Sequence, residues 1–179
     1  MITTRSSQLS TNSLKSVRTS TQPTAKPADA VRLLKEDHRE VGGWFKEYKK
    51  LKNNISKQKL ADKIFLALTI HMQIEEEIFY PAVRAGINDD ALLNEAEVEH
   101  AGVKKLIAEL QEMKAGDRLF DAKVTVLGEY ITHHVKEEET DMFPESRKSD
   151  LDLKALGRQM ADRKAELTAQ AKNKLIRRR

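Results

Sequence analysis

The sequence predicts an all-α protein: four antiparallel amphipathic helices in a bundle, with an additional C-terminal helix. Apolar residues recur every three or four positions in four successive segments, which is the period of an amphipathic helix. The connections between these segments are only a few residues long, so neighbouring helices must run antiparallel. A length of 179 residues with 39% hydrophobic content suits one ordinary core.

The first two helices follow from their apolar stripes. The first stripe consists of Val31, Leu34, His38, Val41, Phe45 and Tyr48, and the second of Leu60, Ile64, Leu68, His71, Glu75 and Ile78. Between them, Asn53-Asn54 followed by Ser56 predicts a helix end and a new N-cap.

The third and fourth helices have the same period. Their stripes are Leu93, Ala96, His100, Val103, Ile107 and Leu110, and then Phe120, Val124, Leu127, Ile131, His134, Glu138 and Met142. Gly86 followed by Asn88-Asp89-Asp90, and Gly116-Asp117, predict the breaks, with the acidic and amide residues as N-cap candidates. A fifth helix is expected from about Asp152 to Ala171, outside the bundle.

Charge divides the chain into three parts. Residues 1–28 hold four basic and no acidic residues, and residues 161–179 hold seven basic and two acidic ones. The net charge is +4, so the part between them carries about −5. We therefore expect a polar basic tail at 1–28, one folded domain at 29–150, and a C-terminal helix with a basic tail at 151–179. The acidic folded domain is not expected to bind nucleic acid.

Several protein classes are disfavoured by composition. The sequence has no run of eighteen apolar residues and no apolar signal-peptide core at its start, so neither a membrane span nor secretion is indicated, and a cytoplasmic location is expected. It has no cysteine, which excludes disulfides, thiolate zinc sites and iron–sulfur ligation by this chain. Any metal must be bound by nitrogen and oxygen.

One pattern occurs twice, 63 residues apart. His71 precedes Glu75, and His134 precedes Glu138, by four residues, and each copy ends in an aromatic residue and a proline. One helical turn separates each pair, so imidazole and carboxylate project from the same face. His38 and His100, 62 residues apart, precede the two copies on other stripes.

Buried carboxylates on these stripes need a cation. A single histidine on an apolar stripe is more often a hydrogen-bonded core residue than a ligand. Glu75 and Glu138, however, would each cost several kcal/mol if buried as ions without a partner, and no lysine or arginine lies on the stripes. Two metal ions would neutralise them. Imidazole with carboxylate suits iron, manganese or zinc, and carboxylates commonly bridge two ions in helical bundles.

The residues next to the candidate ligands are expected to have other roles. His133 also precedes a glutamate, Glu137, by four residues, but His134 shares the apolar stripe and the ten-residue spacing to Pro144, so His133 is expected at the surface. The glutamates next to the ligands, Glu76, Glu77, Glu137 and Glu139, are expected to face solvent or to pair with lysines. Pro81 and Pro144 are expected to kink or end their helices.

The order His38, His71-xxx-Glu75, His100, His134-xxx-Glu138 resembles the hemerythrin-like HHE cation-binding family over about residues 29–150. The resemblance implies an up-down-up-down four-helix bundle that encloses two non-haem iron ions with an oxo or hydroxo bridge. It also implies that His38 and His71 bind one iron, that His100 and His134 bind the other, and that Glu75 and Glu138 bridge them. Each iron would then have five ligands and one free position for a diatomic molecule or peroxide.

The chain departs from the oxygen-carrying members of that family. These carry a fifth histidine one turn from the histidine of the third helix, where this chain has Ala96 and Lys104. Two function classes stay open. One is the binding of O₂, NO or peroxide for sensing, storage or detoxification; the other is a di-iron enzyme of the peroxidase or oxidase type, with no catalytic residue assigned. Repair of iron–sulfur centres, another activity in the family, is a further alternative, but it is less expected here because it usually accompanies an additional cysteine-containing region and this sequence has no cysteine.

Overall fold

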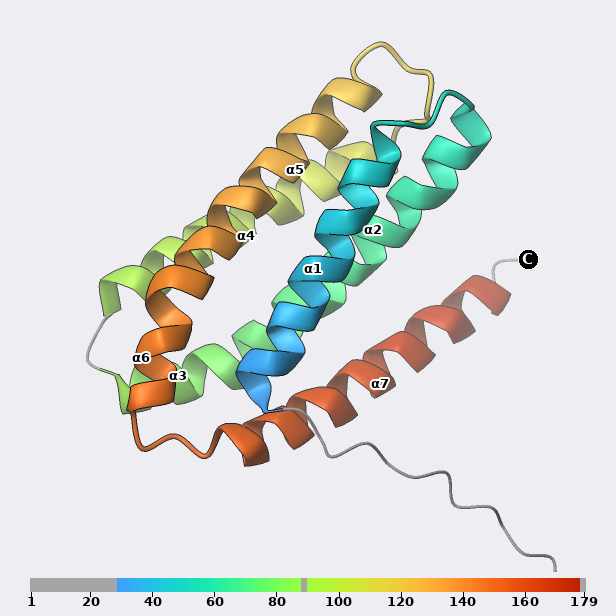
Figure 1. Ribbon diagram of the computed structural model, residues 1–179. Helices are drawn as coiled ribbons and strands as arrows, with labels where there is room; N and C mark the ends of the chain where they lie inside the picture. The colour runs from blue at the N-terminus through green and yellow to red at the C-terminus, as the bar shows by residue number, and fades with distance from the viewer. Residues whose placement is uncertain (1–28, 88–89, 178–179) are drawn as a thin grey trace, which may run out of the picture.

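A computed structural model describes residues 29–87 and 90–177 (Figure 1). The expected tail at 1–28 and the N-cap candidates Asn88 and Asp89 lie outside the described residues. Every regular element in the described ranges is helical, so the all-α prediction is confirmed. No helix in these ranges is both long and apolar enough to cross a lipid bilayer.

Four helical rods form the bundle (Figure 1). The first is α1 (Ala30–Tyr48) and the third is α4 (Asp90–Gln111). The second and fourth are composite. The second consists of α2 (Asn54–Ile74), a π-helical segment η1 (Glu75–Phe79) and α3 (Tyr80–Gly86). The fourth consists of α5 (Phe120–Glu137), a second π-helical segment η2 (Glu138–Met142) and α6 (Phe143–Lys148).

Two of the expected helix boundaries can be compared with the structure. The Asn53 side chain accepts a hydrogen bond from the Ser56 N–H at 3.1 Å and caps α2, as expected. Gly116 has φ 110°, a conformation that residues with a side chain rarely adopt. Asp117 does not cap α5, which corrects the prediction. Its carboxylate accepts the Lys114 N–H at 2.8 Å instead, because the turn folds back before the helix begins.

Pro81 and Pro144 were expected to kink or end their helices, and the second alternative, an end at the proline, is wrong. Each proline follows a π-helical segment, and the rod continues beyond it. The N–H of Tyr80 donates to the carbonyl of Glu75, five residues earlier, and the N–H of Phe143 donates to that of Glu138. A proline has no N–H and its ring crowds the carbonyl four residues before it, so the wider π turn accommodates it. Both π segments begin at the candidate ligand glutamates.

Helix α7 (Leu153–Arg177) packs outside the bundle against α1, α2 and η1, as expected, and continues beyond the predicted end at Ala171 (Figure 1). Met160 anchors it, with a side chain that is fully buried. The connection from α6 packs tightly too, since a Cβ at Gly86 would lie 2.8 Å from the Leu151 side chain.

The buried apolar residues form two clusters. One is centred on Phe79, Phe143 and Leu93, and the other on Phe65, Phe120 and Leu127. Each fully buried side chain of this size contributes roughly 1.5–3 kcal/mol to folding. The candidate ligands lie on the same helices. Along each apolar stripe they lie between the residues of the first cluster and those of the second. This polar layer is therefore enclosed by apolar side chains along the bundle.

Candidate metal centre

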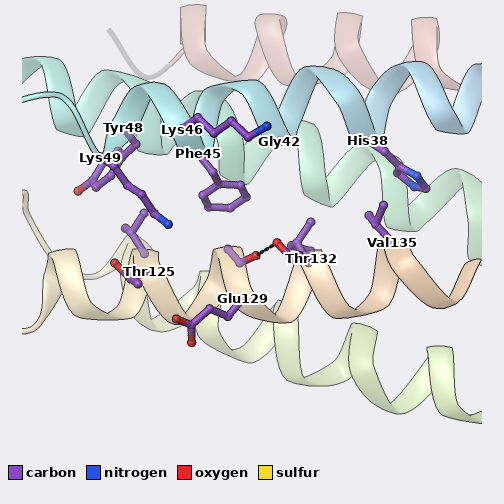
Figure 2. Close-up of a pocket in the computed structure, with 13 residues that line it drawn as sticks. His38, Gly42, Phe45, Lys46, Tyr48, Lys49, Thr125, Glu129, Thr132 and Val135 are labelled. Carbon is purple, nitrogen blue, oxygen red and sulfur yellow. Dashed lines mark hydrogen bonds between the residues drawn. The ribbon is translucent and has the colours of Figure 1, made fainter. Parts of the chain in front are cut away.

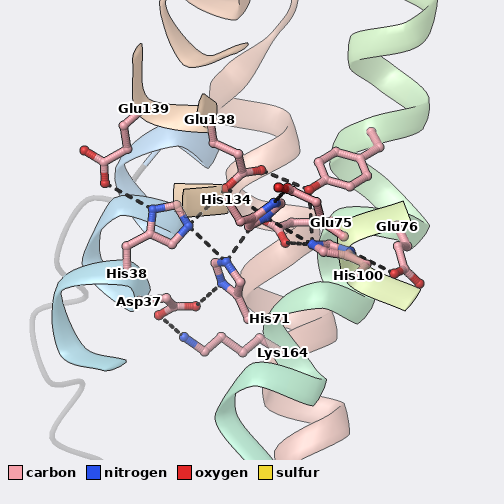
Figure 3. A network of polar contacts seen from close by, with 12 residues as sticks. Asp37, His38, His71, Glu75, Glu76, His100, His134, Glu138, Glu139 and Lys164 are labelled. Atoms are coloured by element: carbon pink, nitrogen blue, oxygen red, sulfur yellow. Dashed lines mark hydrogen bonds and ion pairs between the residues drawn. The ribbon is translucent and has the colours of Figure 1, made fainter. Parts of the chain in front are cut away.

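The six predicted ligands meet inside the bundle (Figure 3). None of them is more than 8% exposed, and Glu75 is fully buried. Each of the four rods contributes one histidine, and the two composite rods also contribute a glutamate. The six are His38, His71, Glu75, His100, His134 and Glu138.

One group of ligand atoms comes from His38, His71, Glu75 and Glu138. The Nε2 atoms of His38 and His71 are 3.1 Å apart. His71 Nε2 lies 3.1 Å from Glu75 Oε1, and His38 Nε2 lies 3.2 Å from Glu138 Oε2. All four atoms lie within 4.8 Å of one another.

The second group comes from His100, His134 and Glu75. The Nε2 atoms of the two histidines are again 3.1 Å apart, and His100 Nε2 lies 3.5 Å from Glu75 Oε2. Glu138 Oε2 is 3.6 Å from His134 Nε2. Both glutamates therefore lie close to both histidine pairs, which is the placement expected of bridging carboxylates.

A ring of four further carboxylates binds the outer nitrogen, Nδ1, of the four candidate ligand histidines. The Nδ1 atoms of the histidines lie 2.7–3.3 Å from these carboxylates. Each carboxylate adjoins a ligand in sequence but reaches the histidine of another rod (Figure 3). The pairs are Asp37 with His71, Glu76 with His100, Glu99 with His134, and Glu139 with His38. Such partners hold the Nδ1 proton and turn Nε2, as a lone pair, toward a metal.

The inner atoms are therefore acceptors that face one another. Three buried carboxylate oxygens, both of Glu75 and Oε2 of Glu138, have no hydrogen-bond donor among the described residues. When the imidazoles opposite them are neutral and carry their proton on Nδ1, their Nε2 atoms present lone pairs to these oxygens. Neighbouring ligands of an octahedral ion, at about 2.1 Å from it, lie about 3 Å apart. The observed spacings of 3.1–3.6 Å fit that geometry.

The pKa values of the centre are displaced in opposite directions. Burial lowers the pKa of His71, but the charge of Glu75 and the hydrogen bond to Asp37 outweigh it and raise the value to about 10. Burial raises the pKa of Glu138, but the His38 imidazole, 3.2 Å away, and the charge of His134 bring it to about 2. Without a metal, His71 thus keeps a second proton that faces the carboxylates. A metal at this place would replace that proton.

Tyr80 is a neighbour that the sequence did not indicate. Its hydroxyl donates to Glu138 Oε1 at 3.0 Å and lies 3.3 Å from His100 Nε2. Burial and the charges of Glu138 and Glu75 raise its pKa well above 10, so the hydroxyl keeps its proton. Phe143 holds the matching position in the second copy of the motif, nine residues after His134, and its ring stacks on His38. The two halves of the centre therefore differ by one hydroxyl.

The roles predicted for the flanking glutamates need partial correction. Glu76 pairs with Lys104 at 2.6 Å and Glu139 with Lys35 at 3.1 Å, yet both also bind ligand histidines. Lys104 therefore holds Glu76 in place beside His100. Glu77 pairs with Arg163 of α7 at 2.6 Å, away from the centre.

The distinction between His133 and His134 is confirmed. His134 is buried with its Nε2 atom in the centre, whereas the His133 side chain is 61% exposed and pairs with Glu137 at 3.1 Å. His133 Nε2 also lies 3.4 Å from Glu99.

Helix α7 reaches the centre through Lys164. Its ammonium group binds Asp37, which in turn accepts from His71. We expect Lys164→Met to weaken metal binding about tenfold at the His38 and His71 side, because an unanchored Asp37 orients His71 less well. Competition with a chromophoric chelator during reloading of metal-free protein measures this affinity.

Arg163→Met is the matched control, since Arg163 is the adjacent residue and pairs with Glu77 instead. It should leave the metal affinity within about twofold of the unchanged protein. Equal affinities for the two variants would show that Lys164 only attaches α7 to the bundle.

Comparisons with known proteins indicate a cation-binding helical domain. The family model described as Hemerythrin HHE cation binding domain matches residues 29–146. The crystal structure of a hemerythrin HHE cation binding domain-containing protein from Mycobacterium kansasii superposes with a TM-score of 0.72, at 27% identity, over 83% of this chain and 92% of that one.

A second relative is a Nostoc sp. protein named DNA nickase. It is 27% identical over 113 residues, which are 62% of this chain and 31% of the relative. The chain thus spans about a third of that protein's length. The family match covers well over half of the chain and includes all six candidate ligands. This chain belongs to the hemerythrin HHE cation binding domain family.

Proposed function

We propose that this protein holds two non-haem iron ions and binds a small molecule at them, namely O₂, NO or peroxide, for sensing, storage or detoxification. The observation that carries the proposal is the buried cluster of facing acceptors, in which three carboxylate oxygens have no donor among the described residues. Such a cluster is stable only around positive charge. Iron suits mixed imidazole and carboxylate ligands, and it supplies a redox-active Lewis acid.

The ligand assignment follows the two groups of atoms. His38 and His71 would hold one iron, His100 and His134 the other, and Glu75 and Glu138 would bridge them. The 3.1 Å spacing within each histidine pair supports this division.

The side chains at Ala96 and Lys104 support the proposal that one coordination position of a metal ion is free for a small molecule. Oxygen carriers of the family have an additional histidine one turn from the one in the third helix. Here Ala96 is small and buried, while Lys104 points out to Glu76. Neither side chain is a ligand, so the ion at His100 and His134 has fewer protein ligands than in the carriers.

The test combines elemental analysis with spectroscopy. Protein purified without oxygen should contain about two iron ions per chain, and NO, air and peroxide should each be tried for a change in its visible spectrum. A persistent single metal, or zinc in protein from iron-replete cells, would refute the di-iron proposal. Two iron ions with no response to any of the three would instead indicate a saturated structural site.

A di-iron enzyme of the peroxidase or oxidase type is the second candidate, and Tyr80 favours it. Such chemistry needs a proton donor beside the metals. The Tyr80 hydroxyl lies within hydrogen-bonding distance of both a proposed bridging carboxylate and a proposed ligand histidine.

Tyr80→Phe separates the two candidates. If Tyr80 donates a proton, the variant should keep both metals and react with peroxide about 10²-fold more slowly, while NO binding stays nearly unchanged. Tyr48→Phe is the control, because its hydroxyl binds Asp121 at 2.7 Å, far from the centre. Stopped-flow absorbance measures both rates. A peroxide rate equal to that of the control variant would leave small-molecule binding as the supported function.

A further inference from the structure

A groove between α1 and α5 is lined by His38, one of the candidate ligands (Figure 2). Its volume is about 320 Å³, which is within the range of pockets for organic ligands and far more than a diatomic molecule needs. Apolar side chains form most of its inner wall, among them Phe45, Val124, Ile131 and Val135. His38 lines its inner end.

The groove adjoins the space between the ligand histidines. That smaller space is lined by His71, His100 and His134, and three residues line both cavities: His38, Ile131 and Val135. A molecule in the groove would therefore lie against the outer face of the His38 ring, one layer of side chains from the centre.

Glycines make room for the groove. A Cβ placed on Gly42 would have no heavy atom within 4 Å, although this residue lines the groove. Phe45, also on α1, packs so closely against Gly128 of α5 that a Cβ on Gly128 would lie 3.1 Å from the Phe45 ring. The helices thus approach at Gly128, and the open space lies beside Gly42.

Positive charge lies along the α1 side of the groove. Lys46 and Lys49 line it, and neither has an ion-pair partner among the residues that the structure describes. Glu129 also lines the groove, but Figure 2 shows its carboxylate pointing away from α1. His38 and Lys49 are eleven residues apart on α1, or about 16 Å along the helix.

We propose that this groove binds an organic anion with an apolar body, such as a medium-chain carboxylate, whose charged group pairs with Lys46 and Lys49 and whose apolar end lies against His38. The assignment rests on the apolar wall, the two lysines and the distance along α1 between His38 and Lys49. It goes beyond the metal chemistry proposed above and does not depend on which metal is bound.

The experiment uses 1-anilinonaphthalene-8-sulfonate, a fluorescent apolar anion, and decanoate as its competitor, with the protein as purified. Gly42→Leu should fill the groove and weaken dye and decanoate binding at least tenfold. Gly43→Leu is the matched control, because Gly43 is equally unhindered but does not line the groove. The Gly43→Leu variant should bind the dye and decanoate with affinities within twofold of those of the unchanged protein. Both substitutions replace a helical glycine, so neither should lower the melting temperature.

Charge is tested separately with Lys46→Gln combined with Lys49→Gln. This pair should weaken decanoate binding severalfold while the binding of decanol, the uncharged analogue, is unchanged. If Gly42→Leu and Gly43→Leu bind the dye and decanoate equally well, the groove is not the binding site. If the lysine variant loses or retains decanoate and decanol to the same extent, the lysines do not pair with the charged group of the ligand.

Discussion

His134→Ala is expected to lose metal from at least one position and to lower the free energy of unfolding by about 2–4 kcal/mol. The His134 side chain is buried between Glu99 and Glu138, with its Nδ1 atom 2.7 Å from one and its Nε2 atom 3.6 Å from the other. Without the imidazole, Glu99 loses a buried partner and the His100 side of the centre loses one of its two nitrogens. Elemental analysis and urea unfolding measure the two effects.

His133→Ala is the matched control, one residue away. The His133 side chain is 61% exposed, and its ion pairs with Glu99 and Glu137 are near the surface. Exposed pairs contribute little, so the variant should keep both metals and stay within about 0.5 kcal/mol of the unchanged protein. If His133→Ala loses metal and His134→Ala retains it, the inward face of the fourth helix is assigned incorrectly, and Glu138 is not a bridging ligand.

Removal of the metals is expected to lower the melting temperature by roughly 10 °C. Glu75 and Glu138 are 0% and 1% exposed, and they would be left close together with too little positive charge. An uncompensated buried charge costs about 3–5 kcal/mol, and each kcal/mol corresponds to about 2–4 °C in a protein of this size. Calorimetry before and after chelation, with metal removal verified by elemental analysis, gives the shift.

The double variant Glu75→Gln with Glu138→Gln provides the control. It retains the shape of both side chains but removes their charge, so it should bind metal poorly and melt at the same temperature with or without chelator. An unchanged melting temperature in the metal-free original protein would mean that protons alone, such as the one held by His71, stabilise the carboxylates.

Much of the centre could be predicted because its signals are local. The apolar stripes place His38, His71, His100 and His134 on the inner faces of four helices, since helical periodicity depends only on the chain itself. The same local rule separates His134 from His133, because adjacent helical residues diverge by about 100°. In the structure, all four of these histidines are buried, as predicted.

The four outer carboxylates also follow a sequence pattern, which overlaps with the pattern of the ligands. Asp37 and Glu99 each precede a ligand histidine, and Glu76 and Glu139 each follow a ligand glutamate, at matching places in both copies. Repetition in register distinguishes them from ordinary surface acids. Glu76 and Glu139 were predicted to face solvent or to pair with lysines because their angles on their own helices place them beside the stripe, and no role was predicted for Asp37 and Glu99.

By itself, the sequence determined that this protein has four amphipathic helices with an inward row of histidines and two buried glutamates. Only the tertiary structure decided which histidine each outer carboxylate binds, that Tyr80 donates to Glu138, and that α1 and α5 leave a groove beside Gly42. Helical period is set by backbone hydrogen bonds within one segment. Contacts between helices depend instead on how side chains of different segments pack, and residues far apart in the sequence determine that packing together.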